Sequence, residues 1–388
     1  MLKRCLKLSL SAVLFLFAAT ASAQVPIKVG MVLEMTGPFA DIGRQIMSGI
    51  RAYMKVHGDV VAGRKVELIV KDTTGMAPEV AKRQAQELIT INEVDFLAGF
   101  GLTPNALSVA PLATEAKKPM IIMNAATSVI TSRSPYIARV SMTLPQVTAP
   151  LASWALKNGI KQAYTLVSDY GPGIDSETQF KKTFTAGGGQ IVGSVRTPVN
   201  NPDFGPFLRR IKDEKPQAVF VFLPQGEQPV AFMKGFAERG LDKAGIKMIA
   251  TGDLTEDSLI DAMGDAPLGV VTTHQYSVAH DSPQNRAFLK AYADITSARP
   301  NFLAVGAWDG MAAIYEVIRR LNGKVDGDKA MEVLKGMKID SPRGPIMIDA
   351  ETRDVVQTIY VRRAEKLKDG KIYNVEFDQF ANVKDPGK

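Results

Sequence analysis

The sequence predicts an α/β protein made of two lobes, each built on a parallel β-sheet. Apolar β-rich runs alternate with amphipathic stretches of helical spacing along most of the chain, which is typical of βαβ units. The series starts after residue 26 and starts again near residue 146. The chain has 388 residues, which corresponds to about two or three domains. Each series is therefore long enough to form a sheet of its own.

The first series supplies the elements of the first lobe. Proline stands near the start of two of its helices, a position where its missing N–H costs no hydrogen bond. The expected strands cover 27–35, 66–70, 95–100 and 119–123, and the expected helices cover 44–57, 78–91 and 104–116.

The second series repeats this alternation. A run of three glycines, 187–189, ends one of its helices. The expected helices cover 146–158, 176–186, 203–212, 227–239 and 254–263, and the expected strands cover 163–168, 190–197, 218–223, 247–250 and 269–276.

The last hundred residues differ from both series, because three helical stretches follow one another and short β-rich runs come after them. No linker rich in Ser, Pro or Gly separates the two series, so we expect short crossings between the lobes. The expected helices cover 285–296, 304–321 and 329–337, and the short strands, forming a small antiparallel addition, cover 346–348, 355–361 and 372–377.

The amino terminus has the three parts of a secretory signal. Three basic residues precede an apolar stretch, 8–19, and the small residues Ala21–Ala23 suit a signal peptidase. We therefore expect a signal peptide over 1–23, cleavage after Ala23 and a periplasmic protein. The one cysteine, Cys5, precedes the apolar stretch, whereas a lipoprotein cysteine would follow it.

Composition excludes several classes of function. Removing the basic residues of the signal lowers the net charge from +7 to +4, and no basic block with interleaved aromatic residues suggests nucleic acid. One cysteine and three scattered histidines predict neither a metal site nor a disulfide framework. Motifs for a nucleophilic serine, a zinc hydrolase, a P-loop or a dinucleotide site are missing, so we expect no catalysis and no cofactor. The acidic stretch 253–265 is interpreted as a solvated helix face.

Hydroxyl-rich turns follow five of the predicted strands. The carboxyl ends of parallel strands line the crevice where α/β proteins bind ligands. Hydroxyls and free backbone N–H groups there would suit a carboxylate, although each such residue could instead be a helix cap. The turns cover 36–40, 101–105, 124–128, 169–173 and 251–253.

The segment 27–43, IKVGMVLEMTGPFADIG, resembles the opening of the branched-chain amino-acid (Leu/Ile/Val) type of periplasmic solute-binding proteins of ABC importers. The strand 66–72 and the strand and turn 119–127 are similar too, and the resemblance covers about 27–380. It implies a type I periplasmic binding protein, with two Rossmann-like lobes joined by three hinge crossings. We expect 26–144 with 277–344 in lobe 1, and 145–276 with 345–388 in lobe 2.

The resemblance also implies a ligand site. In the family, the turns after the third and fourth strands hold the ligand's carboxylate, which here implies Thr103 with Asn105, and Ala125 with Thr127. Pro104 departs from the family, whose members often carry a serine near that position.

The second lobe is expected to supply the remaining polar contacts. Tyr170 matches a family tyrosine. Asp253 falls near the acidic residue that receives a ligand ammonium; it could instead cap the helix 254–263.

Two departures predict a more apolar pocket. Ile42 replaces a tyrosine that members of the family often have in the opening loop, and Leu223 with its neighbours replaces an aromatic residue of the family's second lobe. Phe39 lies, with these two residues, at the strand ends that face the crevice. Trp308 is a candidate cleft wall, with helix packing as the alternative.

These expectations converge on a binding protein with no catalytic activity. We expect a monomer that captures a small apolar or aromatic carboxylate, either an aromatic acid or a branched-chain or hydrophobic amino acid, and docks on a membrane permease. The alternative is a sensory binding protein of the same fold that presents the ligand to a receptor.

Overall fold

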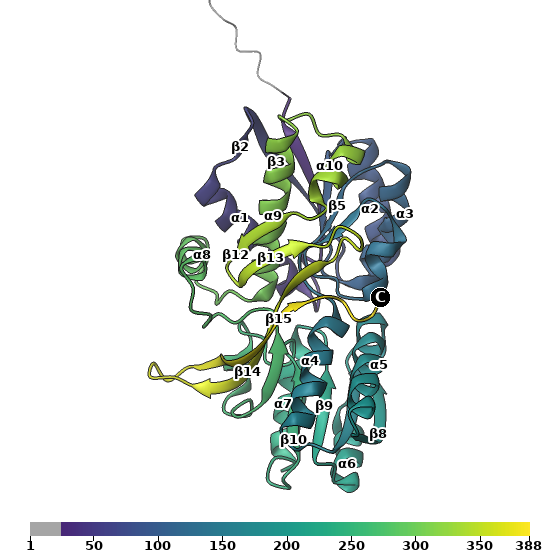
Figure 1. Cartoon of the computed structure of the whole chain (residues 1–388), viewed down its shortest axis with the longest axis vertical. Helices are drawn as coiled ribbons and strands as arrows, with labels where there is room; N and C mark the ends of the chain where they lie inside the picture. The colour runs from purple at the N-terminus through teal and green to yellow at the C-terminus, as the bar shows by residue number, and fades with distance from the viewer. Residues whose placement is uncertain (1–24) are drawn as a thin grey trace, which may run out of the picture.

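The computed structural model describes residues 25–388, and the predicted signal peptide lies outside them. The chain forms an elongated α/β molecule with two lobes, one above the other in Figure 1, each organised around its own sheet. The predicted fold class is confirmed.

Lobe 1 is built on a six-stranded sheet of order β2-β3-β1-β4-β5-β6, parallel except for the short β2. Helices α1 and α9 pack together, as do α2 and α3. The strands are β1 (Ile27–Leu33), β2 (Val60–Val61), β3 (Arg64–Asp72), β4 (Phe96–Gly99), β5 (Met120–Ile122) and β6 (Ile137–Arg139). The helices are α1 (Ala40–His57), α2 (Pro78–Thr90), α3 (Thr103–Glu115), the 3-10 turn η1 (Ser128–Arg133), α8 (Pro283–Ala293), α9 (Phe302–Arg320) and α10 (Gly327–Leu334).

Lobe 2 contains five parallel strands in the order β8-β7-β9-β10-β11, followed by the antiparallel strand β14. Helices α4 and α5 pack together, and α6 packs on α7. The strands are β7 (Gln162–Ser168), β8 (Gln190–Thr197), β9 (Ala218–Phe222), β10 (Lys247–Thr251) and β11 (Val271–His274). The helices are α4 (Leu144–Lys157), α5 (Gly171–Ala186), α6 (Gly205–Glu214), α7 (Glu227–Glu238) and the 3-10 turn η2 (Ile260–Met263).

Strand β9 shows why an uninterrupted apolar run forms a strand here. All five of its residues are buried, because helices cover both faces of the sheet. Phe220 stacks on Phe180 of α5 with ring centroids 4.2 Å apart, while Val219 and Val221 belong to the cluster on the opposite face. The alternation of side chains along a strand thus feeds two separate cores.

The chain passes between the lobes three times before its last hairpin. It crosses between β6 and α4, again between β11 and α8, and finally along β14 (Val355–Lys366). Strand β14 pairs first with β13 (Gly344–Ile348), whose hairpin partner is β12 (Lys338–Ser341), and then with β11. The expected lobe boundary at 344/345 therefore falls inside the β12–β13 hairpin.

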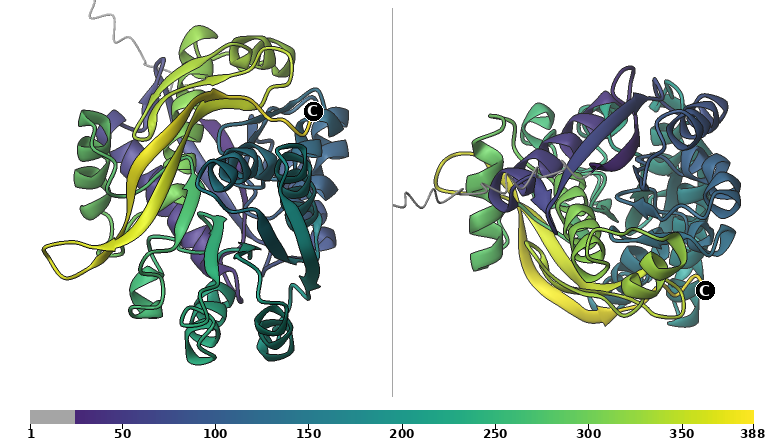
Figure 2. Two further views of the ribbon diagram at one scale, coloured as in Figure 1. Left: turned by 60° about the horizontal axis from the view of Figure 1, so that its bottom comes forward. Right: turned by 90° about the horizontal axis from the view of Figure 1, so that it is seen from above.

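The carboxyl-terminal addition is larger than the sequence pattern indicates. β14 and β15 (Ile372–Val383) are twelve residues each and form a long antiparallel ribbon, drawn in yellow in Figure 2. The expected strands 355–361 and 372–377 stop early, because the second half of each strand, 362–366 in β14 and 378–383 in β15, contains charged or polar residues.

The predicted helix 254–263 is wrong. This segment consists of turns that end in η2, and its acidic residues do not form the expected solvated face. Asp253, Glu256 and Asp257 are at most 3% exposed. Their carboxylates bond side chains and backbone from other elements, and those bonds hold the segment out of a helix. Only Asp261 and Asp265 are exposed.

Candidate functional site

The candidate site is a narrow cleft between the carboxyl ends of the strands of the two lobes. The two walls lie so close together that little open space remains between them. Lobe 1 and the first crossing contribute Gly101, Leu102, Thr103, Asn124, Ala126, Met142 and Leu144, and lobe 2 contributes Tyr170, Pro172, Phe222, Gln225 and Asp253.

The two lobes touch around this cleft, so the structure represents a closed form. A Cβ atom added to Gly171 of lobe 2 would lie 2.8 Å from Thr127 Oγ1 of lobe 1. The backbone N–H of Ser128 donates to Asp175 Oδ2 at 3.0 Å, and the hydroxyl of Ser258 donates to Asp41 Oδ2 at 3.1 Å.

The lobe 1 wall presents hydroxyls from the start of α3 and from the turn after β5. Thr103 is the first residue of α3, and its Oγ1 accepts a long hydrogen bond, 3.4 Å, from the backbone N–H of Thr127. The Thr127 hydroxyl is buried and has no hydrogen-bond partner. This wall therefore offers a free hydroxyl and the positive end of a helix dipole to an anion.

The lobe 2 wall presents an aromatic surface and a carboxylate. The rings of Tyr170 and Phe222 stack with centroids 6.1 Å apart. Asp253 follows β10; its Oδ2 accepts from the Thr251 hydroxyl at 2.8 Å and its Oδ1 accepts from the Gln225 amide. Burial and then the charge of Asp253 raise the pKa of Tyr170 well above its usual value, so the phenol stays neutral.

A histidine lies directly behind Asp253. His274 is fully buried at the end of β11, and its Nε2 is 3.7 Å from Asp253 Oδ2, too far for a hydrogen bond. Neither ring nitrogen of His274 has a hydrogen-bond partner. Burial lowers the pKa of His274 to about 4, so the ring is neutral beside the cleft.

A buried arginine holds the turn after β5 from behind. The Arg139 guanidinium pairs with Asp354 through Nε and Oδ1 at 2.6 Å, and its Nη1 donates to the carbonyls of Ala125 and Thr127, both at 2.9 Å. No sequence signal marks Arg139, because a lone arginine at the end of a short strand carries no motif.

Of the predicted site residues, Thr103, Tyr170 and Asp253 line the cleft, and Thr127 lies at its edge against Gly171. The backbone N–H of Ala125 is not free for a ligand, because it donates to the Phe100 carbonyl at 2.9 Å.

Other predicted site residues lie behind the walls. The amide of Asn105 is used within lobe 1, since it donates to Glu34 Oε1 at 2.8 Å and accepts from the backbone N–H of Ala77 at 3.0 Å. Phe39 and Ile42 are buried near the start of α1, and Leu223 belongs to the core between β9 and α7.

Trp308 lies outside the cleft altogether. It sits in the middle of α9 and makes edge-to-face contacts with Tyr53 and Phe288, at centroid distances of 5.1 and 5.4 Å. The structure therefore brings it together with the aromatic residues of α1 and α8, as the helix-packing alternative expects, and not with Tyr170.

Nine of the twelve residues that line the cleft were not predicted as contacts. Five of them stand in turns that the sequence predicts at the strand ends: Gly101, Leu102, Asn124, Ala126 and Pro172. Phe222 and Gln225 are close neighbours of Leu223. Met142 and Leu144, in and beside the first crossing, carry no recognisable signal, because crossings are not marked by periodicity.

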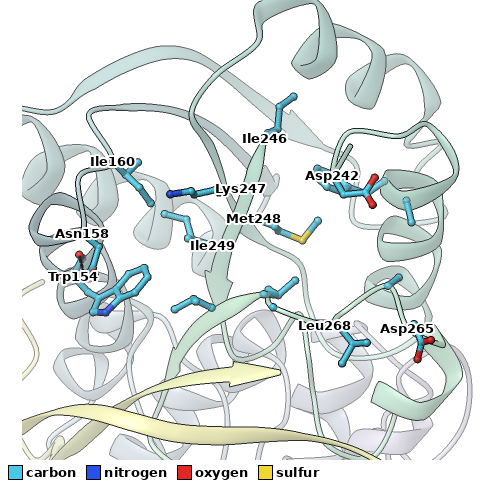
Figure 3. A pocket seen from close by; sticks show the side chains of 16 residues that line it. Trp154, Asn158, Ile160, Asp242, Ile246, Lys247, Met248, Ile249, Asp265 and Leu268 are labelled. Carbon is cyan, nitrogen blue, oxygen red and sulfur yellow. Dashed lines mark hydrogen bonds between the residues drawn. The ribbon is translucent and has the colours of Figure 1, made fainter. Parts of the chain in front are cut away.

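A second, wider hollow lies elsewhere, at the amino ends of β10 and β11. Trp154, Ile160 and Ile249 line one side of it and Met248 and Leu268 another, as Figure 3 shows. It is far along lobe 2 from the strand ends that form the cleft. Residues 25–388 contain no cluster of three metal-ligating side chains, and no helix among them has the length and apolar character needed to cross a membrane.

Comparison with known proteins agrees with this architecture. Residues 26–371 match the family model described as periplasmic binding protein. A Leu/Ile/Val-binding protein homolog 6 from Brucella melitensis is 44% identical over 98% of both chains.

Solved structures are similar over almost the whole chain. The solute-binding protein of an ABC transporter from Rhodopseudomonas palustris BisB5, in complex with 3,4-dihydroxybenzoic acid, is 54% identical with a TM-score of 0.91, covering 93% of this chain and 99% of its own. A second one, from Rhodopseudomonas palustris HaA2 in complex with p-hydroxybenzoic acid, is 44% identical with the same TM-score and coverage. The chain belongs to the periplasmic binding protein family.

Proposed function

We propose that this protein is the extracytoplasmic solute-binding component of an ABC importer and that it captures a hydroxybenzoate-type aromatic carboxylate between its lobes. The observation that carries the proposal is a cleft with the hydroxyls of Thr103 and of the unpartnered Thr127 on one wall and an aromatic surface ending in Asp253 on the other. Similar solute-binding proteins in complex with dihydroxy- and hydroxybenzoic acid support the same ligand class.

The proposed carboxylate subsite lies in lobe 1. No lysine, arginine or histidine is among the residues that line the cleft, so the anion would be held by hydroxyls and by the amino end of α3. The unpartnered Thr127 hydroxyl supplies one donor, and Thr103 supplies a second. Buried polar groups are normally paired, so an unpartnered hydroxyl beside a cleft favours a ligand partner.

The ring would lie against the aromatic wall. Tyr170 and Phe222 offer a stacked surface, and Met142 and Leu144 cover the other side. A planar ring buried between these groups gains hydrophobic and stacking energy without demanding further polar partners.

Asp253 distinguishes an aromatic acid from an amino acid. Both of its oxygens already accept a hydrogen bond from lobe 2, and each has capacity for one more. A ring hydroxyl needs only one such acceptor, whereas a buried ammonium needs acceptors for all three of its N–H donors. The geometry thus favours a phenolic donor over an α-amino group.

The remaining features of the proposal follow from the family. We propose cleavage after Ala23, a monomer in the periplasm, docking of the closed form on a membrane permease, and no catalytic role. We also propose lobes close to 26–144 with 277–344 and 145–276 with 345–388.

Isothermal titration of ligand-stripped protein tests the ligand class. We expect 4-hydroxybenzoate and 3,4-dihydroxybenzoate to bind tightly, benzoate more weakly, and leucine and phenylalanine weakest. Two matched probes separate the subsites: 4-hydroxybenzyl alcohol lacks the carboxylate, and cyclohexanecarboxylate lacks the aromatic ring. Tight binding of leucine with no response to any benzoate would overturn the proposal.

A further inference from the structure

A buried carboxyl group lies directly behind the lobe 1 wall, and none of the proposed ligand contacts uses it. Glu34 follows the last residue of β1 and is 0% exposed. A Cβ atom added to Gly101 would lie 2.2 Å from Glu34 Oε2. Since Gly101 itself lines the cleft, one layer of backbone separates this carboxyl group from the ligand space.

Glu34 is held there by one side-chain hydrogen bond. Its Oε1 accepts from Asn105 Nδ2 at 2.8 Å, while Oε2 is buried and makes no well-formed hydrogen bond, although the nearby backbone of Gly101 and Leu102 favours the ionised form. Asn105 Nδ2 also donates to the Gly75 carbonyl at 2.9 Å, so the bond ties the end of β1 to the first turn of α3 and to the turn after β3. That first turn carries Thr103, which faces the cleft.

No cation compensates the charge of Glu34 among the described residues. The acidic groups on the neighbouring elements are Asp72 at the end of β3 and Asp41 on α1. Asp72 accepts from the backbone N–H of Met35, and Asp41 pairs with Arg44 at 3.4 Å. Across the cleft stand Asp253 and the neutral His274.

Burial raises the pKa of Glu34 to about 7, although the Asn105 hydrogen bond lowers it in part. Slight burial raises the pKa of Asp72, but the hydrogen bonds that its carboxylate accepts lower this pKa by more. Asp72 therefore stays ionised throughout the neutral range. Glu34 is therefore the group directly behind the Gly101 backbone that changes charge near neutral pH.

We propose that Glu34 is a positioning residue that couples capture of the ligand's carboxylate to uptake of one proton from solvent. This inference rests on the proposed function, because it places an anion on the cleft side of the Gly101–Thr103 backbone. Two carboxylates on either side of that backbone, both poorly hydrated, cannot both ionise without a large cost. The proton binds to Glu34 Oε2, and the ligand then remains as the single negative charge at the amino end of α3.

The direction in which pH changes the ligand affinity follows from the linkage between ligand binding and proton binding. Below the pKa of Glu34 the residue is already protonated, and binding takes up no proton. Above it, each unit of pH lowers the affinity by up to about tenfold until the ligand complex itself loses the proton. Glu34→Gln keeps the size and the polarity of the side chain but carries no charge, so its affinity should not depend on pH over this range.

Calorimetric titration with 4-hydroxybenzoate at about pH 5.5 and about pH 8, in pairs of buffers that differ in ionisation enthalpy, measures the uptake directly. For the wild-type protein we expect weaker binding and uptake approaching one proton at the higher pH. Glu34→Gln should bind with nearly equal affinity at both values and without uptake.

Glu256→Gln is the matched control, because burial also raises the pKa of Glu256 to about 7, but its carboxyl group lies at the contact between Ser258 and Asp41 and not behind the lobe 1 wall. This variant should keep the proton uptake. Uptake that survives in Glu34→Gln, or disappears in Glu256→Gln, would overturn the assignment to Glu34.

The failure of this inference is distinguishable from failure of the proposed function. If the wild-type protein binds no benzoate at any pH, the proposed function is wrong; if it binds with the same affinity at both pH values, only the role of Glu34 is wrong. Should Glu34→Gln fail to fold, infrared difference spectroscopy of the wild-type protein remains decisive. Ligand addition at about pH 8 should produce a carboxylic-acid band, and its absence contradicts proton uptake.

Discussion

Closure of the cleft depends on a glycine at the start of α5. Gly171 approaches Thr127 so closely that a Cβ atom would stand 2.8 Å from Thr127 Oγ1 and 3.6 Å from Thr103 Cγ2. Both neighbours are short, buried side chains on the opposite lobe. Gly171→Ala therefore introduces a methyl group where the lobes meet, at the subsite proposed for the carboxylate.

The size of the expected loss of ligand affinity follows from the distance between the added methyl group and Thr127. A 2.8 Å approach is shorter than Cβ atoms tolerate, so the lobes must part or Thr127 must rotate. Overpacking of a close contact costs about 1–3 kcal/mol. If that cost falls on the closed form alone, the ligand affinity drops by roughly 5- to 150-fold. Unfolding of the open, ligand-free form should change little, because alanine favours a helix more than glycine does.

Titration calorimetry with 4-hydroxybenzoate and thermal unfolding of the ligand-free protein measure the two effects separately. Gly205→Ala is the matched control, since Gly205 is likewise the first residue of a helix in lobe 2 but lies away from the cleft. Its added Cβ atom would meet the flexible end of Arg239 at 3.1 Å and Asp203 Oδ1 at the same distance. If Gly171→Ala binds within twofold of the wild-type protein, the proposed closed state is not the one that holds the ligand.

Three further outcomes are expected. Thr127→Ala should weaken binding about tenfold or more while ligand-free unfolding stays nearly unchanged, because the hydroxyl has no partner in the fold; a large loss of ligand-free stability would assign it to the core instead. Asp354→Asn should destabilise the protein by about 3–5 kcal/mol in urea unfolding, since it leaves the fully buried Arg139 uncompensated; a loss below about 1 kcal/mol contradicts this. Glu256→Gln should flatten the pH dependence of unfolding. The raised pKa of Glu256 means that its stabilising contribution is complete below its unfolded pKa and is lost as pH rises through about 7, so a slope unchanged between about pH 5 and 8 would refute it.

The sequence predicts the two-lobed α/β architecture because strands and helices each leave a local pattern of apolar residues in the chain. Strands such as β9 are buried on both faces and read as continuous apolar runs, and proline or glycine marks the ends of several helices. The same local signals locate the turns at the strand ends. Within those turns, the resemblance to the family of solute-binding proteins then singled out Thr103, Tyr170 and Asp253.

Contacts between distant segments are what the sequence does not show. Asp253, Glu256 and Asp257 have the spacing of a polar helix face, yet they are buried by partners such as Asn374 and Asn301, which lie more than forty residues away. Asn105 stands in the expected turn, but its amide is consumed by Glu34, 71 residues earlier. A polar residue in a turn predicts that a hydrogen bond forms there, not which group forms it.

The division of labour between the lobes has a consequence for selectivity. Lobe 1 offers hydroxyls and a helix terminus but no cation at the cleft, so its hold on an anion is moderate by itself. Lobe 2 contributes the ring surface of Tyr170 and Phe222 together with Asp253 at the far end. A ligand therefore gains its full binding energy only when both walls reach it, and they can do so only if its length matches the gap left when Gly171 meets Thr127. A shorter acid satisfies lobe 1 without reaching Asp253, and a longer one holds the lobes apart. Closure of the lobes thus selects ligands by their length. In the proposed function the permease recognises the closed form, so it docks only with protein that holds a ligand of the right length.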